Sequence, residues 1–349
     1  MEVVESDEDL ASYFARHERT YGKTNPCFVD QFLEGALEVD VDLVCFKDRA
    51  IVAGIVEHIE VAGVHSGDSM GVLPPQRLKP ETRKTIEDTC LNLAKVLGVL
   101  GLLNVQLAIK NDEVFIIEAN PRASRTIPFI AKAKGVSFVD YSVLAMLEEP
   151  CPEELKSLDW SNLDTVCVKG VVFPFKKFPD SDSILGPQMK STGESMGRGE
   201  DYPTALLKAF IGADYAMPQS GRVFLSLRNK DKEDLLPSVK ILNHLGFSLL
   251  ATKGTANFLK DQGLECESVN KVLEGRPHCV DRIRSGEVAM VINTTYGKDS
   301  IKASYSIRRS CLDFSVPCLT ESEAAKAYVL ALRQKKAGQL SVEPLSLSL

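Results

Sequence analysis

The stretch "LNVQLAIKNDEVFIIEANPRASRT", residues 103–126, decides the fold that we expect for the first part of the chain. Apolar and polar residues alternate on both sides of the polar run 111–113, a pattern typical of two antiparallel strands joined by a tight turn. A turn of these three residues sets Lys110 opposite Val114. The two isoleucines, Ile116 and Ile117, indicate a buried strand. In this register one face of the hairpin is apolar and carries Val105, Leu107, Ile109, Phe115 and Ile117.

Counting back from that turn defines the polar face of the hairpin. Gln106 comes to lie opposite Glu118, and Asn104 opposite Asn120. Carboxylate and amide oxygens are the ligands that Mg²⁺ prefers, with water and substrate phosphates completing its coordination. The polar face therefore predicts a metal site formed by Gln106, Glu118 and Asn120.

Two arginines, Arg122 and Arg125, follow the second strand almost at once. A guanidinium pairs with phosphate oxygens through two parallel hydrogen bonds, so arginines beside a metal suit a metal-bound polyphosphate. The residue types alone also allow an ordinary strand end with an exposed arginine–glutamate ion pair, because such pairs are common at protein surfaces.

The composition is ordinary for a soluble globular protein. Of 349 residues, 44% are hydrophobic and 26% charged, and the length allows two or three domains. The net charge of −7 and a pI near 5.5 argue against nucleic acid as the main partner. We see neither a membrane-spanning run nor a signal peptide. The nine cysteines form no CxxC pair and are expected to be reduced, mostly buried thiols of a cytosolic protein.

The first part of the chain, residues 1–149, reads as strands and helices in alternation. Apolar and acidic residues at period two predict strands, whereas apolar residues at helical spacing after Pro80 predict a helix. Gly135 interrupts a second helical pattern. The expected elements are strands over 37–46 and 50–60, a helix over 79–99, the hairpin, and helical segments over 128–149.

The remainder of the chain changes character twice. Residues 150–215, rich in proline and glycine, are expected to form a packed connector with one helix near 203–213. From Ser220 onward strands and helices alternate regularly. For residues 216–349 this alternation predicts a parallel sheet covered by helices, a Rossmann-like domain, so the whole chain is assigned to the α/β class.

A second candidate site lies in this last part, where "FSLLATKGTANFL" (247–259) reads as a strand, a small polar turn and a helix. Free N–H groups and the helix dipole favour an anion at the start of that helix. Ligands of open α/β sheets bind at the carboxyl ends of strands, where "INTT" (292–295) also ends. A simple helix cap explains the small polar turn equally well. The candidate residues are Thr252, Gly254, Thr255, Lys232, Lys271, Asn293 and Thr295.

The order of these residues resembles the ATP-grasp ligases, and most closely the second, carbamate-phosphorylating half of the carbamoyl phosphate synthetase large subunit. The resemblance covers essentially the whole chain in order. It implies a partial ATP-grasp domain followed by a methylglyoxal-synthase-like regulatory domain. The segments that carry it are "DQFLEGALEVDVD" (30–42), "EHIEVAGVHSGDS" (57–69), "EANPRASRT" (118–126), "LGPQMKSTGESMG" (185–197) and "VINTTYG" (291–297).

The resemblance implies a role for each candidate residue of the first site. Gln106, Glu118 and Asn120 would hold Mg²⁺ or Mn²⁺, and Arg122 and Arg125 would steady the transferring phosphate of ATP. The implied nucleotide contacts are Glu38 at the ribose, Gln31 and Leu33 near the base, the loop residues Gly63, Val64, His65 and Ser66, and the shared residues Gln106 and Glu118.

Two histidines near that loop are interpreted separately. Without the family, "AGVHSGDS" is only a loop of small residues with available backbone N–H groups. His65 taken alone is as compatible with a structural role as with ligand binding. His58 lies within a strand and is interpreted as a packing or hydrogen-bonding residue.

The regulatory domain of the resembling family binds UMP or IMP, which would place the effector at Ser226, Lys232, Thr252, Gly254, Thr255, Lys271, Asn293 and Thr295. Glu60, Asp68 and Thr320 match contacts of an ornithine site, but Gly170 stands where ornithine-responsive relatives carry an acid. Methylglyoxal synthase itself uses a catalytic aspartate after a Gly-Gly approach. Asp281 lacks that approach, which argues against lyase chemistry.

The resemblance implies a cytoplasmic ligase that phosphorylates carbamate with ATP for pyrimidine and arginine synthesis. Its partners would be a glutamine amidotransferase small subunit and the N-terminal part of the large subunit, including a Gly-rich loop and phosphate-clamping basic residues. We find no such loop in the sequence, so the chain alone is expected to be inactive. The alternatives are a nucleotide-sensing module without turnover and, less favoured, methylglyoxal synthase.

Overall fold

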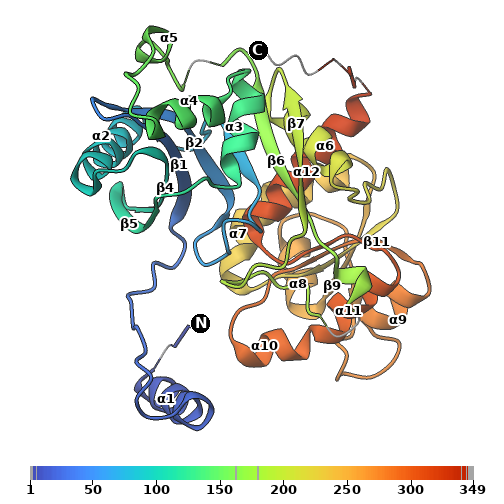
Figure 1. The fold of residues 1–349 in the computed structure, drawn as a ribbon. Coiled ribbons are helices and arrows are strands. Elements are labelled where there is room, and N and C mark those ends of the chain that lie inside the picture. The colour runs from blue at the N-terminus through green and yellow to red at the C-terminus, as the bar shows by residue number, and fades with distance from the viewer. Residues whose placement is uncertain are drawn as a thin grey trace.

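The protein contains two β-sheets of different kinds, joined by helices (Figure 1). The computed structural model describes residues 3, 4, 6–161, 163–178, 181–338, 340–342 and 344. Within this part of the chain, no helix combines the length and apolar character needed to cross a membrane.

The first sheet has seven strands in the order β5-β4-β1-β2-β3-β6-β7, and every neighbouring pair is antiparallel. The strands predicted over 37–46 and 50–60 and the predicted hairpin are all present. The bounds are β1 Leu37–Cys45, β2 Ala50–Val61, β3 Gly71–Leu73, β4 Gly101–Lys110, β5 Glu113–Asn120, β6 Val166–Val172 and β7 Gly193–Gly199.

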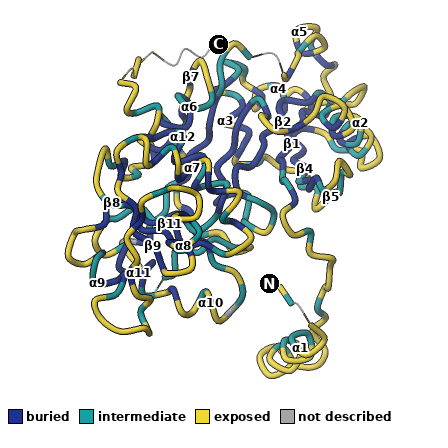
Figure 2. The backbone as a smooth tube through the Cα atoms, turned by 180° about the vertical axis from the view of Figure 1, so that it is seen from behind, coloured by how far each residue is buried: buried dark blue, intermediate teal, exposed yellow. Residues whose placement is uncertain are grey.

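Helices cover both faces of this sheet. One face packs on α2 through Ile86, Cys90 and Ala94, as the helical spacing predicted. The other face packs on α3 and α4, which Gly135 separates in a left-handed conformation. The helices are α1 Asp7–Tyr21, α2 Pro80–Leu97, α3 Thr126–Lys134, α4 Phe138–Met146, α5 Glu153–Lys156 and α6 Tyr202–Gly212, with a 3₁₀ turn at Phe175–Lys177. Helix α1 has no buried residue and lies apart from both sheets (Figure 2).

Strands β6 and β7 were both assigned to the connector in the sequence; for β7 the reason is that its glycine-rich run "GESMGRG" resembles a loop. Its glycines are required by the close approach of α6. A Cβ atom at Gly197 would lie 2.0 Å from the carbonyl oxygen of Ala205, and one at Gly199 would lie 2.8 Å from the amide nitrogen of Ala205. The expected connector therefore contributes two strands to the first sheet.

The second sheet is wholly parallel, in the order β10-β9-β8-β11-β12, as the alternation after Ser220 predicted. Its strands are β8 Arg222–Ser226, β9 Ser248–Thr252, β10 Glu267–Val269, β11 Val288–Asn293 and β12 Cys318–Leu319. Its helices are α7 Lys232–His244, α8 Lys253–Asp261, α9 Cys279–Arg284, α10 Lys298–Ala303, α11 Tyr305–Asp313 and α12 Ser322–Ala337, with a 3₁₀ turn at Asn229–Asp231.

One hydrophobic cluster connects the two sheets. It includes Val72 of β3, Phe210 of α6 and Tyr328 of α12, together with side chains of α7 and of strands β8, β9 and β11. The two sheets therefore share a packed interior.

Candidate functional site

The hairpin places the predicted metal ligands side by side, although its turn differs from the prediction. The turn has two central residues, Asn111 and Asp112, which adopt positive φ angles of 53° and 65°. Lys110 therefore pairs with Glu113, and the predicted pairing with Val114 is wrong.

A register shift between Gln106 and Leu107 compensates for the shorter turn. Ile117 is the extra residue of this bulge, since Leu107 pairs with Ile116 and Gln106 pairs with Glu118. The pairings of Gln106 with Glu118 and of Asn104 with Asn120 are thus confirmed.

The expectation that the isoleucines of β5 are buried is wrong. Ile116 and Ile117 are 49% and 50% exposed, because β5 is an edge strand of the sheet. The partner strand β4 carries the buried side chains, among them Val105 and Leu107. The hairpin thus presents its polar site on a solvent-accessible edge.

The donor set of the hairpin fits a divalent cation that also binds phosphate. The Nε2 of Gln106 donates to Asp40 over 3.2 Å, and the Nδ2 of Asn120 donates to Glu118 over 2.9 Å. Because the amide N–H groups have carboxylate partners, the amide oxygens remain available as ligands. The described residues contain no cluster of three acidic, histidine or cysteine side chains able to hold a metal. A metal here would therefore need phosphate oxygens and water as well.

A buried hydrogen-bond network adjoins the hairpin, on the face of the sheet that carries Gln106. The Nε2 of His58 lies 2.8 Å from Asp40, and its Nδ1 lies 3.4 Å from Glu38. Burial alone would lower the pKa of His58, but its hydrogen bond to Asp40 and the charge of that carboxylate raise the pKa to about 9. Burial would raise the pKa of Asp40, but His58 lowers it to about 2. His58 is a hydrogen-bonding residue, as predicted.

Arg122 and Arg125 lie in the loop between β5 and α3, and both side chains are exposed. The guanidinium of Arg122 donates to the carbonyl of Ala123 over 3.1 Å. Within the described part of the chain, the guanidinium of Arg125 has no hydrogen-bond or ion-pair partner. The exposed guanidiniums can therefore reach a ligand beside the hairpin.

The predicted nucleotide contacts approach the same region from β1 and β2. The backbone N–H of Gly63 donates to Glu38 over 3.3 Å, so the loop after β2 meets the predicted ribose anchor. His65 has structural bonds: its Nδ1 accepts from Gly67, and its N–H donates to Gly186. The other predicted contacts lie near them, with Gln31 and Leu33 in the segment before β1 and Val64 and Ser66 in the loop.

The predicted effector residues gather at the carboxyl ends of the parallel strands. Ser226 ends β8 and pairs with Asn293, which ends β11. Thr252 ends β9 and pairs with Val269, two residues before Lys271. The ends of four neighbouring strands thus form one edge, where helix α8 begins.

Two observations favour ligand binding at this edge over a simple helix cap. Thr252 precedes α8 but its side chain makes no capping hydrogen bond. The buried amide nitrogen and oxygen of Asn293 and the hydroxyl of Thr295 have no partner among the described residues.

Two other predicted effector residues already bond within the protein. The hydroxyl of Thr255 accepts from the N–H of Leu227 over 3.2 Å. Lys232 donates to the carbonyl of Gly254 over 2.9 Å, at the start of α8.

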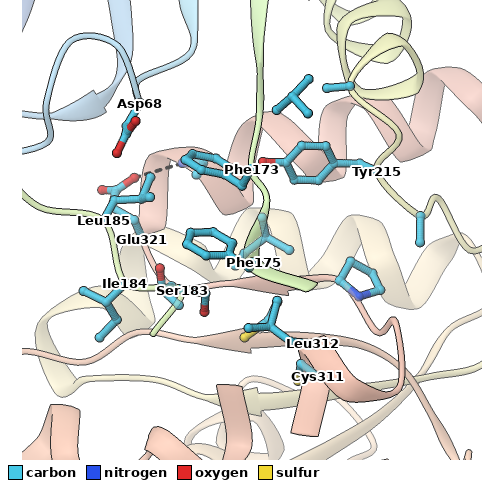
Figure 3. A pocket seen from close by; sticks show the side chains of 18 of the residues that line it. Asp68, Phe173, Phe175, Ser183, Ile184, Leu185, Tyr215, Cys311, Leu312 and Glu321 are labelled. Atoms are coloured by element: carbon cyan, nitrogen blue, oxygen red, sulfur yellow. Dashed lines mark hydrogen bonds between the residues drawn. The ribbon is translucent and has the colours of Figure 1, made fainter. Parts of the chain in front are cut away.

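A cavity of about 520 Å³ lies between the two sheets. It brings together Glu60, Asp68 and Thr320, the residues matched to an ornithine site, and also reaches Thr295. In Figure 3 the carboxylates of Asp68 and Glu321 lie on one side, and the rings of Phe173, Phe175 and Tyr215 lie opposite them. Burial raises the pKa of Glu60 and of Glu321 to about 7.

Asp281 has a structural role in this arrangement. Its carboxylate accepts from the N–H of His278 over 2.9 Å, which caps α9, and it pairs with Arg276. The hydrogen bond to Arg276 holds the pKa of Asp281 well below its ordinary value. These contacts give no support to lyase chemistry.

All nine cysteines are free thiols, and seven are buried, as expected.

Comparisons with known proteins point to one family. Residues 1–149 match the "Carbamoyl-phosphate synthase L chain, ATP binding domain", and residues 234–320 match the "MGS-like domain". Together with the antiparallel sheet and the following parallel sheet, these matches confirm the predicted fold class: an ATP-grasp part followed by a methylglyoxal-synthase-like domain.

Relatives of known name align over almost the whole chain. The carbamoyl phosphate synthase large chain of Myxococcus xanthus is 44% identical, with coverage of 98% of this chain and 32% of that protein. The "Carbamoyl phosphate synthase large chain, C-terminal section" of Methanopyrus kandleri is 42% identical, with coverage of 96% and 63%. The chain thus spans about a third of the length of the large chains that it matches.

Among solved structures, the biotin carboxylase of Campylobacter jejuni in complex with βγ-ATP aligns with a TM-score of 0.48 at 15% identity. The alignment covers 61% of this chain and 53% of that protein. The biotin carboxylase domain of the Hydrogenobacter thermophilus 2-oxoglutarate carboxylase, in complex with MgADP and bicarbonate, aligns with a TM-score of 0.47 at 14% identity, covering 60% and 53%.

Proposed function

Because the chain corresponds to the C-terminal part of carbamoyl phosphate synthase large chains, we propose that it serves the ATP-dependent phosphorylation of carbamate to carbamoyl phosphate within a complete synthetase. The observation that carries this proposal is the pairing of Gln106 with Glu118, with Arg122 and Arg125 in the loop that follows. Oxygen ligands followed closely by exposed guanidiniums are the groups that phosphoryl transfer requires.

The residues divide the work in the following way. A bound Mg²⁺ or Mn²⁺ would neutralise phosphate charge. Three side chains present oxygens toward that ion: Gln106, Glu118 and Asn120. The amide of Gln106 is held in place by its hydrogen bond to Asp40, and that of Asn120 by its hydrogen bond to Glu118. The guanidiniums of Arg122 and Arg125 bind the transferring phosphate and stabilise the charge on its oxygens.

The nucleotide contacts complete the site. Glu38 binds the ribose of ATP, and Gly63, Val64, His65 and Ser66 line the nucleotide beside it. Gln31 and Leu33 lie next to the base. The hydrogen bond from Gly63 to Glu38 supports this arrangement, because it joins the loop to the ribose anchor.

The direct test is the partial back-reaction, in which a complete synthetase forms ATP from ADP and carbamoyl phosphate. A complete synthetase in which this chain replaces the corresponding C-terminal part of the large chain should catalyse the back-reaction. Substitution of Arg122 or Arg125 should abolish it. A synthetase with an intact glutamine-hydrolysing subunit but no back-reaction would refute the proposal.

A second function, nucleotide sensing, is favoured by the unpartnered atoms of Asn293 and Thr295 at the edge of the parallel sheet. A nucleoside monophosphate, UMP or IMP, would place its phosphate at the start of α8, near Thr252, Gly254, Thr255, Lys232 and Lys271, with Ser226 on the neighbouring strand end. Calorimetric titration of the purified chain with UMP, IMP and ATP–Mg²⁺ separates sensing from catalysis. Heat with UMP or IMP but not with ATP–Mg²⁺ would favour a sensing module.

The proposed division is a partial ATP-grasp domain over 1–149, a connector over 150–215 and the regulatory domain over 216–349. The other partners would be a glutamine amidotransferase small subunit and the remaining parts of the large chain. An exposed apolar stripe of Val139, Val143 and Met146 on α4, continued by Leu147 just after the helix, supports a partner of this kind, since a helix apolar on all sides is usually buried.

The free thiols support a reducing compartment such as the cytoplasm, where the product would supply pyrimidine and arginine synthesis. The cavity that joins Glu60, Asp68 and Thr320 would be the ornithine site if the chain has one.

A further inference from the structure

Asp42 of β1 is among the most enclosed charged residues of the first sheet, with a relative exposure of 1%. Its carboxylate accepts three side-chain hydrogen bonds. The donors are the hydroxyl of Ser124 over 2.6 Å, the hydroxyl of Thr126, and the amide of Asn104 over 3.2 Å. A buried carboxylate persists only with partners of this kind, because desolvation is costly.

Two of these donors flank Arg125 in the sequence, and Ser124 is two residues from Arg122. The hydroxyl of Ser124 also accepts from the N–H of Ile127 over 3.1 Å, which joins the loop to the first turn of α3. The guanidiniums themselves do not take part. Asp42 thus fixes the backbone that carries the arginines and leaves their charged ends exposed.

Asn104 extends the same network to the metal end of the site. It pairs with Asp42 in β1 and with Asn120 in β5. The neighbouring acid of β1, Asp40, accepts from Gln106. Two buried acids on adjacent inward positions of one strand therefore support different parts of the site: Asp40 supports the metal ligand, and Asp42 supports the arginine loop.

We propose that Asp42 is a positioning residue that anchors the loop carrying Arg122 and Arg125, and so sets the two guanidiniums for the transferring phosphate. Asp42 is too deeply buried to touch the substrate itself. The proposal rests on the proposed function for the identity of the ligand, but the anchoring of the loop can be measured without it.

The first experiment uses limited trypsin digestion of the purified chain. Trypsin cleaves after arginine, so the bonds 122–123 and 125–126 report how often the loop opens. In Asp42→Asn an N–H group replaces an acceptor and faces the donors of the loop. We expect cleavage at these bonds to rise about tenfold, the factor for the loss of roughly one buried hydrogen bond.

Asp68→Asn is the matched control. Asp68 is equally buried and accepts from the N–H groups of Lys190 and Ser191, so it supports a different loop. This variant should increase cleavage after Lys190 without affecting the arginine loop. If Asp42→Asn does not fold, Thr126→Val removes one donor while the carboxylate stays. Unchanged cleavage after Arg122 and Arg125, or an equal rise at Lys190, would overturn the anchoring role.

The second experiment measures the back-reaction in the complete synthetase. Asp42→Asn should lower kcat about tenfold while KM for ADP stays within about twofold, because the arginines rather than the nucleotide contacts are displaced. In an Arg125→Ala background the same substitution should cost much less, since one of the groups it positions is gone. An equal loss in both backgrounds would indicate a merely structural role. A wild-type synthetase without back-reaction would refute the proposed function, whereas the digestion would still decide the anchor.

Discussion

Gln106 lies directly opposite Glu118 because two features of the hairpin compensate each other. The two-residue turn shifts the ladder by one position, and the bulge at Ile117 shifts it back. Residues between the turn and the bulge pair one position away from the predicted register, with Leu107 opposite Ile116, whereas Gln106 still faces Glu118.

Glu118→Ala, placed in the complete synthetase, should abolish carbamate phosphorylation and leave glutamine hydrolysis measurable. The loss should be roughly a thousandfold or more, because a preorganised electrostatic contact to the metal-bound phosphate is removed. Glu113→Ala, at the exposed other end of β5, is the matched control and should remain near wild type. A near-normal back-reaction in Glu118→Ala would disprove the metal role.

The purified 349-residue chain should neither hydrolyse ATP nor make carbamoyl phosphate at a useful rate. The site lies on an open sheet edge, so water is not excluded and the phosphates are not enclosed. Phosphate release from ATP–Mg²⁺ is the measurement, with the complete synthetase as the positive control. Full activity of the chain alone would mean that the catalytic fold is already complete within it.

Lys271→Ala should weaken UMP binding about tenfold in calorimetry, since a lysine and helix N-terminal amides each contribute on the order of a kcal/mol to a partly buried phosphate. The effect should shrink at high salt. Lys260→Ala, at the opposite end of α8, changes the same charge and should have little effect. Equal affinity for uridine and UMP would remove the phosphate from the proposal.

The pair of His58 and Asp40 predicts a dependence of stability on pH. The folded pKa of His58 is raised from 6.5 to about 9, so its contribution is fully present below pH 6.5 and is lost as the pH rises through about 9. This contribution is on the order of 3 kcal/mol. Urea unfolding between about pH 7.5 and about 9.5, mostly above the range in which Glu60 and Glu321 titrate, should show the decline. His58→Gln and Asp40→Asn should each abolish it, and a persistent decline in both variants would assign it to other groups.

Ornithine should bind only weakly to the cavity between the sheets. Gly170 supplies no carboxylate, and a Cβ atom there would lie 2.4 Å from the hydroxyl of Ser195 and 2.8 Å from the carbonyl of Ala209. Asp68 is already engaged by the backbone of Lys190 and Ser191. Calorimetry should give a dissociation constant no tighter than roughly 1 mM, about −4 kcal/mol. Gly170→Glu should lower stability and fail to restore binding. Micromolar binding to the wild-type chain would contradict this account.

Much of the fold was predictable because the chemistry of each segment is local. Period-two alternation identified β1, β2 and the hairpin, and helical spacing identified α2. Strand–helix alternation predicted the parallel sheet, whose topology places the carboxyl ends of its strands along one edge. The facing of Gln106 and Glu118 was predicted correctly only because the bulge at Ile117 offsets the miscounted turn.

Other features depended on contacts between segments that are distant in the sequence. Strand β7 needs the backbone of α6 against Gly197. The helix itself was predicted near 203–213, but no local pattern reveals that it packs on this strand. Burial of β5 failed as a prediction because an edge strand has a neighbour on one side only.

The sequence by itself determined which residues carry oxygen ligands and guanidiniums, and on which strand face they lie, because alternation along a strand is a property of the backbone. Only the tertiary structure decided that Asp40 and Asp42 are buried beneath them. Each acid looked like an ordinary polar position of an amphipathic strand. Packing of α3 and its preceding loop onto that face supplied Ser124 and Thr126 as partners of Asp42, and the neighbouring strand β2 supplied His58 as the partner of Asp40. That exchange of water for protein donors cannot be read from one strand alone.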